Sequence, residues 1–181
     1  NQTPVEVLTG PGQSVDRVWA IAGGADRLLM IRAIDDANLT TDCAAGSAKT
    51  VWMVGSLTSV PAQSTGVAQK LAGLPQSGSG GYSPPSAVFQ QLGNTSPDMA
   101  AIALEDGRAY GLGNNVYNGY GLSPPSFGRL GPAAAVLLPS TWGTVRSFGA
   151  AFYYCLCAIR DDGTVVVSGC DGFGELGLGT A

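Results

Sequence analysis

An internal repeat constrains the fold of this sequence more than any other feature. The stretch from Cys157 to Gly179 holds an Asp-Gly pair between two apolar segments and ends in Gly172-Phe173-Gly174-Glu175-Leu176-Gly177. A second copy runs from Ile102 to Leu122, at a constant offset of 56 residues from the first. Internal periods of this length are typical of propellers and solenoids.

A third copy lies nearer the N-terminus, where residues 50–55 align with 108–113 at an offset of 58. Each copy also has an apolar strand upstream. Residues 18–23 match 145–150, and residues 89–93 fall at the offset of 56 before the latter. Each unit is therefore predicted to contain an upstream strand followed by a β-hairpin with Asp-Gly, or an insertion, at its turn.

The units resemble the repeats of the regulator of chromosome condensation superfamily. The resemblance rests on Ala20-Ile21-Ala22-Gly23-Gly24, an apolar strand ending in Ala-Gly-Gly, and on the stretch from Cys157 to Gly179. The sequence departs from that pattern in two ways. Val54, Leu112 and Ser168 stand where an aromatic residue is usual, and the His that commonly follows Ala-Gly-Gly is absent.

The resemblance implies an all-β fold, a partial β-propeller of about three four-stranded antiparallel blades. The expected units are residues 1–66, with an insertion at 33–49, then 67–122 and 123–181, and the sequence units can be offset from the blades. The 27 Gly and 11 Pro also favour short strands and tight turns over long helices. Closed propellers have about four to eight blades, so we expect further blades or other chains to cover the two ends.

Composition argues against several functions. The chain has no His, which leaves out Ser-His-Asp and Cys-His catalysis, and the neighbouring Asp pairs 35–36 and 161–162 are interpreted as turn residues. A net charge of −4 argues against a nucleic-acid partner, and no apolar run is long enough to span a membrane. We expect no enzyme activity, no cofactor and no metal. The aromatic run 152–154 is read as core packing, with a ligand platform as the alternative.

Two features favour an extracellular or cell-surface location. Asn38 and Asn94 stand in Asn-x-Ser/Thr sequons, as does Asn1, and Asn38 lies in the polar insertion, so covalent glycans are expected at Asn38 and Asn94. The stretches 83–86 and 123–126, both Ser-Pro-Pro-Ser, resemble modified sites of plant and algal wall proteins, or are rigid extended loops.

Cysteine spacing is the second feature. A two-residue type I′ turn at Asp162-Gly163 places Cys155 opposite Cys170, at a Cβ separation of about 4.5–5.5 Å. A one-residue bulge brings Cys157 toward Cys170 instead. In the superfamily that the chain resembles, secreted members often carry a Cys pair across this hairpin, with the second Cys at the position of Val167. Cys43 is then a partner for the remaining Cys or a link to another chain, and a four-Cys zinc site is the competing interpretation.

Three functions of different kinds are compatible with these observations. The first is a non-catalytic extracellular structural, adhesion or assembly module of a cell-surface or filament glycoprotein, whose partners are other chains or further blades. The second is a protein-binding propeller of the exchange-factor or inhibitor type. The third is a carbohydrate-acting enzyme, which the three Glu of the chain disfavour.

Overall fold

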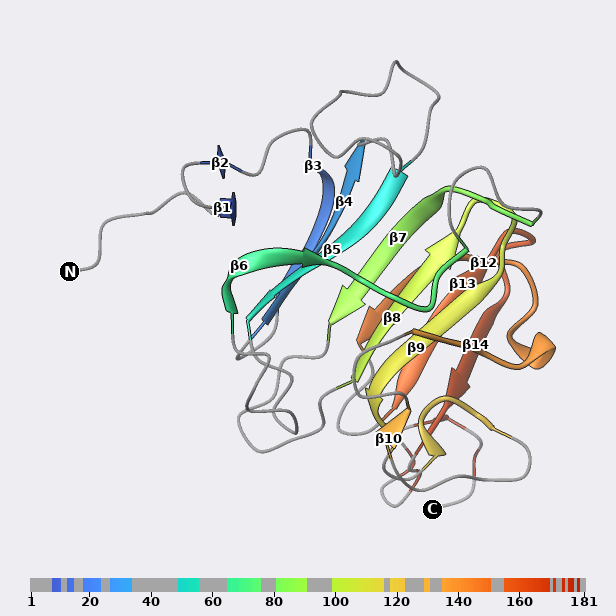
Figure 1. Cartoon of the computed structure of the whole chain (residues 1–181). Coiled ribbons are helices and arrows are strands. Elements are labelled where there is room, and N and C mark those ends of the chain that lie inside the picture. The colour runs from blue at the N-terminus through green and yellow to red at the C-terminus, as the bar shows by residue number, and fades with distance from the viewer. Residues whose placement is uncertain are drawn as a thin grey trace.

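The protein is described by a computed structural model in which three β-sheets follow one another along the chain (Figure 1). The structure describes residues 8–10, 13–14, 18–23, 27–33, 49–55, 65–75, 81–90, 99–115, 118–122, 129–130, 135–150, 155–169, 171, 174, 176–177 and 179. The predicted all-β class is confirmed. Among these residues no helix is long and apolar enough to cross a membrane.

The first sheet has six strands in the order β2-β1-β6-β5-β4-β3. They are β1 (Leu8–Gly10), β2 (Gln13–Ser14), β3 (Val18–Gly23), β4 (Arg27–Ala33), β5 (Lys49–Gly55) and β6 (Thr65–Lys70). Strand β1 pairs with β6 in parallel, and the other neighbours are antiparallel. Four consecutive strands, β3 to β6, thus form an antiparallel meander like the predicted unit. The expected boundary between residues 66 and 67 falls inside β6.

The second sheet has the order β10-β9-β8-β7, with β11 also paired to β9. Its strands are β7 (Pro85–Gln90), β8 (Met99–Leu104), β9 (Ala109–Asn114), β10 (Arg129–Leu130) and β11 (Val136–Leu137). The third sheet, in the order β12-β13-β14, comprises β12 (Val145–Ala150), β13 (Leu156–Arg160) and β14 (Val165–Ser168). A short 3₁₀ helix, η3 (Ser140–Trp142), precedes it.

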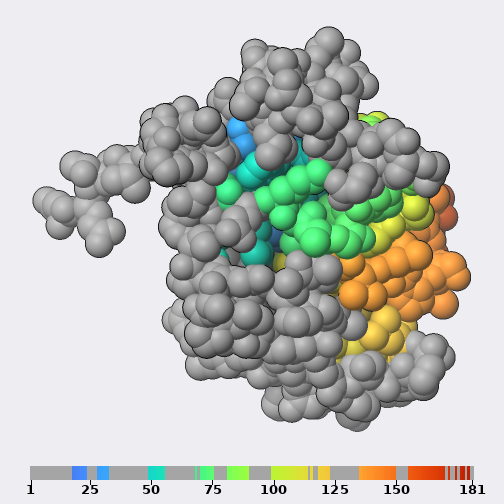
Figure 2. All heavy atoms as spheres, viewed as in Figure 1, coloured from blue at the N-terminus to red at the C-terminus, as the bar shows by residue number. Residues whose placement is uncertain are grey.

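The second sheet lies between the other two, and β7 lies against both β3 and β12. Figure 2 shows the same order on the surface, where cyan, green and orange atoms of the three sheets succeed one another. Two apolar cores result, one between the first and second sheets and one between the second and third. Every residue of β8 is buried, because each face of this strand packs against a neighbouring sheet. This accounts for its uninterrupted apolar sequence Met-Ala-Ala-Ile-Ala-Leu.

Strand pairing confirms the hairpin part of the sequence repeat. Thr50 pairs with Arg32 in the first sheet, and Arg108 accepts the equivalent bond from Leu104 in the second. In the third sheet Thr164 accepts from Arg160 at 2.9 Å. The offsets of 58 and 56 residues deduced from the sequence therefore join structurally equivalent positions.

The alignment of the upstream strands is only partly correct. Strands β3, β7 and β12 begin at Val18, Pro85 and Val145, and each has a register shift directly after that residue. Val18 and Val145 are thus equivalent, as predicted. Pro85, rather than Phe89, is the third member, at an offset of 60 from Val145. The difference arises because the connection to the next strand spans 91–98 in the second sheet and 151–155 in the third.

The turn at Asp162-Gly163 differs from the predicted type I′ turn. The Arg160 N–H donates to the Thr164 carbonyl at 2.9 Å and the Gly163 N–H donates to the Arg160 carbonyl at 3.0 Å, so three residues form the loop. Gly163 takes the left-handed conformation, with φ of 83°. Leu156 consequently pairs with Ser168 and Cys157 with Val167. The register is one residue away from the one that places Cys155 directly opposite Cys170.

Candidate functional site

The candidate site is a sheet surface that recurs three times in the structure. We call it the forward face, because in the first two sheets it packs on the next sheet along the chain. It consists of two rows across the strands, each contributed by three paired residues. The rows are Ala20–Ile31–Val51 and Ala22–Leu29–Met53 in the first sheet, Ala87–Ala103–Ala109 and Phe89–Ala101–Gly111 in the second, and Ser147–Ile159–Val165 and Gly149–Cys157–Val167 in the third.

The forward face is buried in the first and second sheets. Leu29, Ile31, Val51 and Met53 lie in the core shared with the second sheet. The alanines of the second sheet lie in the core shared with the third. Their small side chains leave room for Tyr120, whose ring atoms come within 2.7 Å of the position that a Cβ on Gly111 would take.

The forward face of the third sheet is open. Val165 is 65% exposed, Ile159 37% and Val167 36%, whereas the equivalent Ala109 and Ala103 of the second sheet are 4% and 0% exposed. No charged side chain belongs to either row of this face. Adjacent exposed β-branched side chains on one sheet face are typical of a surface that another protein covers.

The opposite end of the stack is open only along its first strand. Val18, Trp19 and Ile21 of β3 are exposed, with Ile21 at 65%. Met30 and Trp52, on the face of the first sheet that carries Ile21, are nevertheless buried. The Arg32 guanidinium lies 4.8 Å from the Trp52 ring centroid, within range of a cation–π interaction.

Polar contacts at the sheet boundaries hold the sheets in register. Between the first and second sheets, Lys49 Nζ lies 2.7 Å from Glu105 Oε1, and the Tyr82 hydroxyl both accepts from the Lys49 N–H and donates to the Lys49 carbonyl. Between the second and third sheets, Trp142 Nε1 donates to the Tyr120 carbonyl at 2.8 Å. These bonds fix how far each sheet can slide over its neighbour.

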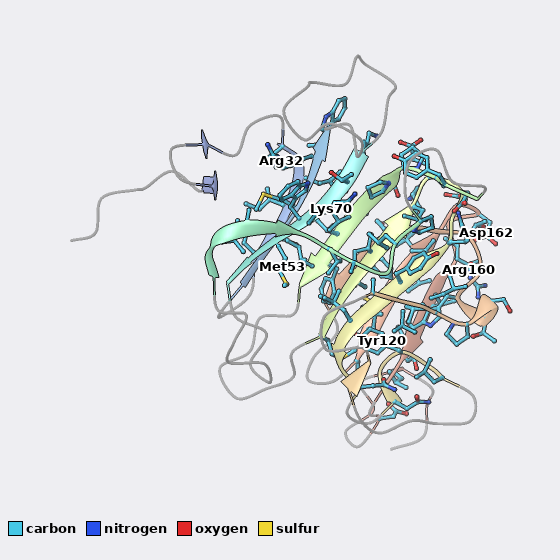
Figure 3. All side chains as sticks on the ribbon, viewed as in Figure 1. Arg32, Met53, Lys70, Tyr120, Arg160 and Asp162 are labelled. Atoms are coloured by element: carbon cyan, nitrogen blue, oxygen red, sulfur yellow. The ribbon has the colours of Figure 1, made fainter. Side chains whose placement is uncertain are left out.

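Tyr120 is fully buried beside the second sheet (Figure 3). Its hydroxyl accepts from the Ala100 N–H at 3.1 Å and donates to the carbonyls of Ala100 and Leu112. Asn115 Oδ1 accepts from the Tyr120 N–H at 3.0 Å, and Ser168 Oγ donates to the Asn118 carbonyl at 3.1 Å. Residues 115–122 thus link the second sheet to the third. The sequence repeat included this segment but gave no indication of its contacts.

The Asp residues of the two Asp-Gly turns have structural roles. Asp162 accepts from both the N–H and the hydroxyl of Thr164, and the side-chain bond is the largest cause that holds the pKa of Asp162 below 3.8. Partial burial raises the pKa of Asp106, but the hydrogen bonds from Arg108 outweigh it and lower the pKa. Figure 3 shows Asp162 at one end of the third sheet, near Arg160. Asp162 is a turn residue, as predicted.

The predicted covalent sites fall mostly on residues that the structure does not describe. Cys43, Cys170, Asn38, Asn94 and the aromatic run 152–154 all lie outside the described residues. Cys155 is buried, and the partly buried Cys157 donates its thiol to the Gly149 carbonyl at 3.0 Å. The pairing of Cys170 with Cys155 or Cys157 stays a prediction. Ser83, in the first Ser-Pro-Pro-Ser stretch, is buried and accepts from the Asp106 N–H.

A cavity between the first two sheets is too small for a ligand. It has a volume of about 10 Å³ and is lined by both lysines of the chain, Lys49 and Lys70, together with Ser83 and Leu104. That volume holds about one water, whereas ligand pockets span about 300–1,000 Å³. Within the described ranges, no three His, Cys, Asp or Glu side chains gather as metal ligands do.

Comparison with known proteins gives a likeness of fold. No family model matches the chain, and no curated protein matches it. Among solved structures, the crystal structure of human WBSCR16 aligns with a TM-score of 0.58 at 20% sequence identity. The alignment covers 87% of this chain and 34% of that one, so this chain spans about a third of the protein that it is similar to.

Proposed function

We propose that the three sheets are blades of a partial β-propeller and that the chain is a non-catalytic assembly module. The open forward face of the third sheet is the observation that carries this proposal. Surfaces equivalent to it form the two internal interfaces of the molecule, so this surface has the composition of an interface. The stacking of four-stranded meanders around β3, β7 and β12 supports a propeller arrangement.

The experiment uses the protein in cells that produce it. Wild-type chain and the variant Val165→Asp are extracted under mild conditions and separated by size, with Arg146→Gln as the control at an exposed position. We expect the wild type and the control to migrate in an assembly and Val165→Asp to migrate as the free chain. Migration of all three variants as free chain would contradict the assembly function.

We further propose that the module belongs to an extracellular or cell-surface glycoprotein. The sequons at Asn38 and Asn94 and the Cys residues flanking the last hairpin support this location. Peptide mapping of native-source protein without reduction tests it directly. We expect glycan mass at Asn38 and a disulfide from Cys170 to Cys155 or Cys157. Unmodified Asn38 together with four free thiols would overturn the extracellular location and leave the assembly function standing.

A further inference from the structure

The turn glycines show what the third sheet lacks. Gly107 and Gly163 are equivalent, with φ of 84° and 83°. A Cβ on Gly107 would lie 2.6–2.7 Å from Thr144, and the Gly107 carbonyl accepts from the Val145 N–H at 2.9 Å. A Cβ on Gly163 would meet nothing within 4 Å. The second sheet's turn is therefore covered by the start of the next inner strand, and the third sheet's turn is uncovered.

The segment that follows the hairpin is built in the same way in both sheets. The Tyr120 N–H donates to Asn115 Oδ1, and 56 residues later the Leu176 N–H donates to Asp171 Oδ1 at 2.8 Å. Gly121 and Gly177 have φ of 63° and 67° and donate to equivalent carbonyls. In the second sheet this segment receives the Trp142 indole N–H. The third sheet forms the same receiving segment.

An aromatic side chain with a polar tip occurs three residues before each inner strand that packs on a preceding sheet. Tyr82 precedes Pro85, and Trp142 precedes Val145. Both tips reach backbone carbonyls of the preceding sheet or of its following segment, at Lys49 and at Tyr120. Val15 stands at the corresponding position before Val18, and it has no hydrogen-bonding tip.

We propose that the forward face of the third sheet binds one further blade of the same construction. This inference rests on the propeller arrangement proposed above. The bound blade has an aromatic donor three residues before its inner strand, an inner strand that starts over Gly163, and a row of apolar side chains like Val88–Ile102–Tyr110 or Phe148–Ala158–Val166 facing Ile159 and Val165.

A second copy of the chain does not offer that surface. Its first sheet is the one that is open on the required side, but Met30 is 2% exposed and Trp52 5%, so the outer part of that face is already covered. Its inner strand also lacks the aromatic donor, because Val15 occupies that position. The chemistry of the face therefore selects a blade of the type of the second or third sheet.

The test supplies such a blade. Residues 126–181 are joined after Ala181, which continues the repeat at its offset of 56 because Ala181 corresponds to Pro125. Val165→Asp is then introduced at position 165 of both the original and the extended chain, and urea unfolding is followed for all four proteins. We expect the substitution to leave the midpoint of the original chain unchanged and to lower the midpoint of the extended chain clearly.

A second variant tests the aromatic donor. Trp142→Phe in the appended segment keeps the ring and removes the indole N–H, and we expect it to lower the midpoint of the extended chain. If the extended chain gives no cooperative transition, residues 82–138 are appended instead, which supplies Tyr82 and the apolar row of the second sheet. Equal effects of Val165→Asp in original and extended chains, for either extension, would overturn the inference.

Light scattering of the original chain gives the remaining outcome. A monomer is expected, because the face selects a blade that the chain itself does not present. A dimer that Val165→Asp dissociates would show that a second copy is the occupant, and the inference would be wrong. The proposed assembly function would survive that result, since it is tested by size in native extracts.

Discussion

Tyr120 shows how one side chain determines the contact between two sheets. It is fully buried, and its hydroxyl meets two backbone carbonyls and one N–H of the second sheet. Its own carbonyl receives the Trp142 indole from the segment that leads to the third sheet. A buried polar group that loses its partner is costly, so these bonds fix the position of the ring.

We predict that Tyr120→Phe destabilises the protein by about 1–3 kcal/mol, because it leaves the Ala100 N–H and the carbonyl of Leu112 without their buried partner. Urea unfolding measures the change. Trp142→Phe, which removes the other bond of this contact, serves as the comparison, and neighbouring substitutions of this kind are expected to be non-additive. A loss below about 0.5 kcal/mol, as for an ordinary surface site, would contradict the role of the hydroxyl.

Asp162 contributes a pH dependence whose sign follows from its contacts. Its pKa is below 3.8 in the folded protein, so the stabilisation is present above that value and is lost as the pH falls through the folded-state pKa. We predict that Thr164→Val raises the pKa of Asp162 toward 3.8 and leaves that of Asp106 unchanged. Carbon-detected NMR titration of the two carboxyl groups provides the measurement. An unchanged Asp162 pKa would show that the Thr164 hydroxyl has no influence.

At the level of elements, the sequence predicted the hairpins and their equivalence but not the turn geometry. Asp-Gly suits both a two-residue type I′ turn and a three-residue turn with Gly in the left-handed conformation. In both hairpins the Asp carboxylate accepts from the N–H of the residue after Gly, at Arg108 and at Thr164. Which turn forms changes the register by one residue, and with it the residue that faces Cys157.

The upstream strands were harder to align because connection lengths differ between sheets. A fixed offset of 56 residues matched Phe89 to Val145, whereas the shared register shift identifies Pro85. Ser83 and Pro85 lie in a Ser-Pro-Pro-Ser stretch that reads as a loop. The strand nevertheless starts there, because its first residue pairs with Leu104 at the end of the hairpin. The open face was also beyond the sequence, since burial depends on which sheets are neighbours.

The two turn glycines give a matched pair of substitutions. We predict that Gly163→Ala costs about 1–2 kcal/mol, because alanine is strained at positive φ. Gly107→Ala has the same backbone strain and also places a methyl group 2.6–2.7 Å from Thr144, so we expect a further loss of about 1–3 kcal/mol. Urea unfolding of both variants tests this. Equal losses would mean that the inner strand of the third sheet does not cover the turn of the second.

At the scale of the whole molecule, the stack behaves as a repeat array whose interior interfaces are complete and whose last interface is open. Each sheet of such an array is stabilised mainly by its nearest neighbours. The second sheet has a neighbour on both sides, and the third has one on one side among the described residues. The same position in two successive sheets is therefore buried once and exposed once.

Ala109 and Val165 are that position, at 4% and 65% exposure. We predict that Ala109→Asp is severely destabilising in the isolated chain, because it places an unpaired charge in the core between the second and third sheets, at a cost of several kcal/mol. Val165→Asp should change the unfolding free energy by less than about 0.5 kcal/mol, as is usual for exposed sites. Urea unfolding at two protein concentrations distinguishes burial within the chain from burial between chains. A large, concentration-dependent loss for Val165→Asp would show that this face is already covered in the isolated protein, and the open end of the array would then be an interface between copies.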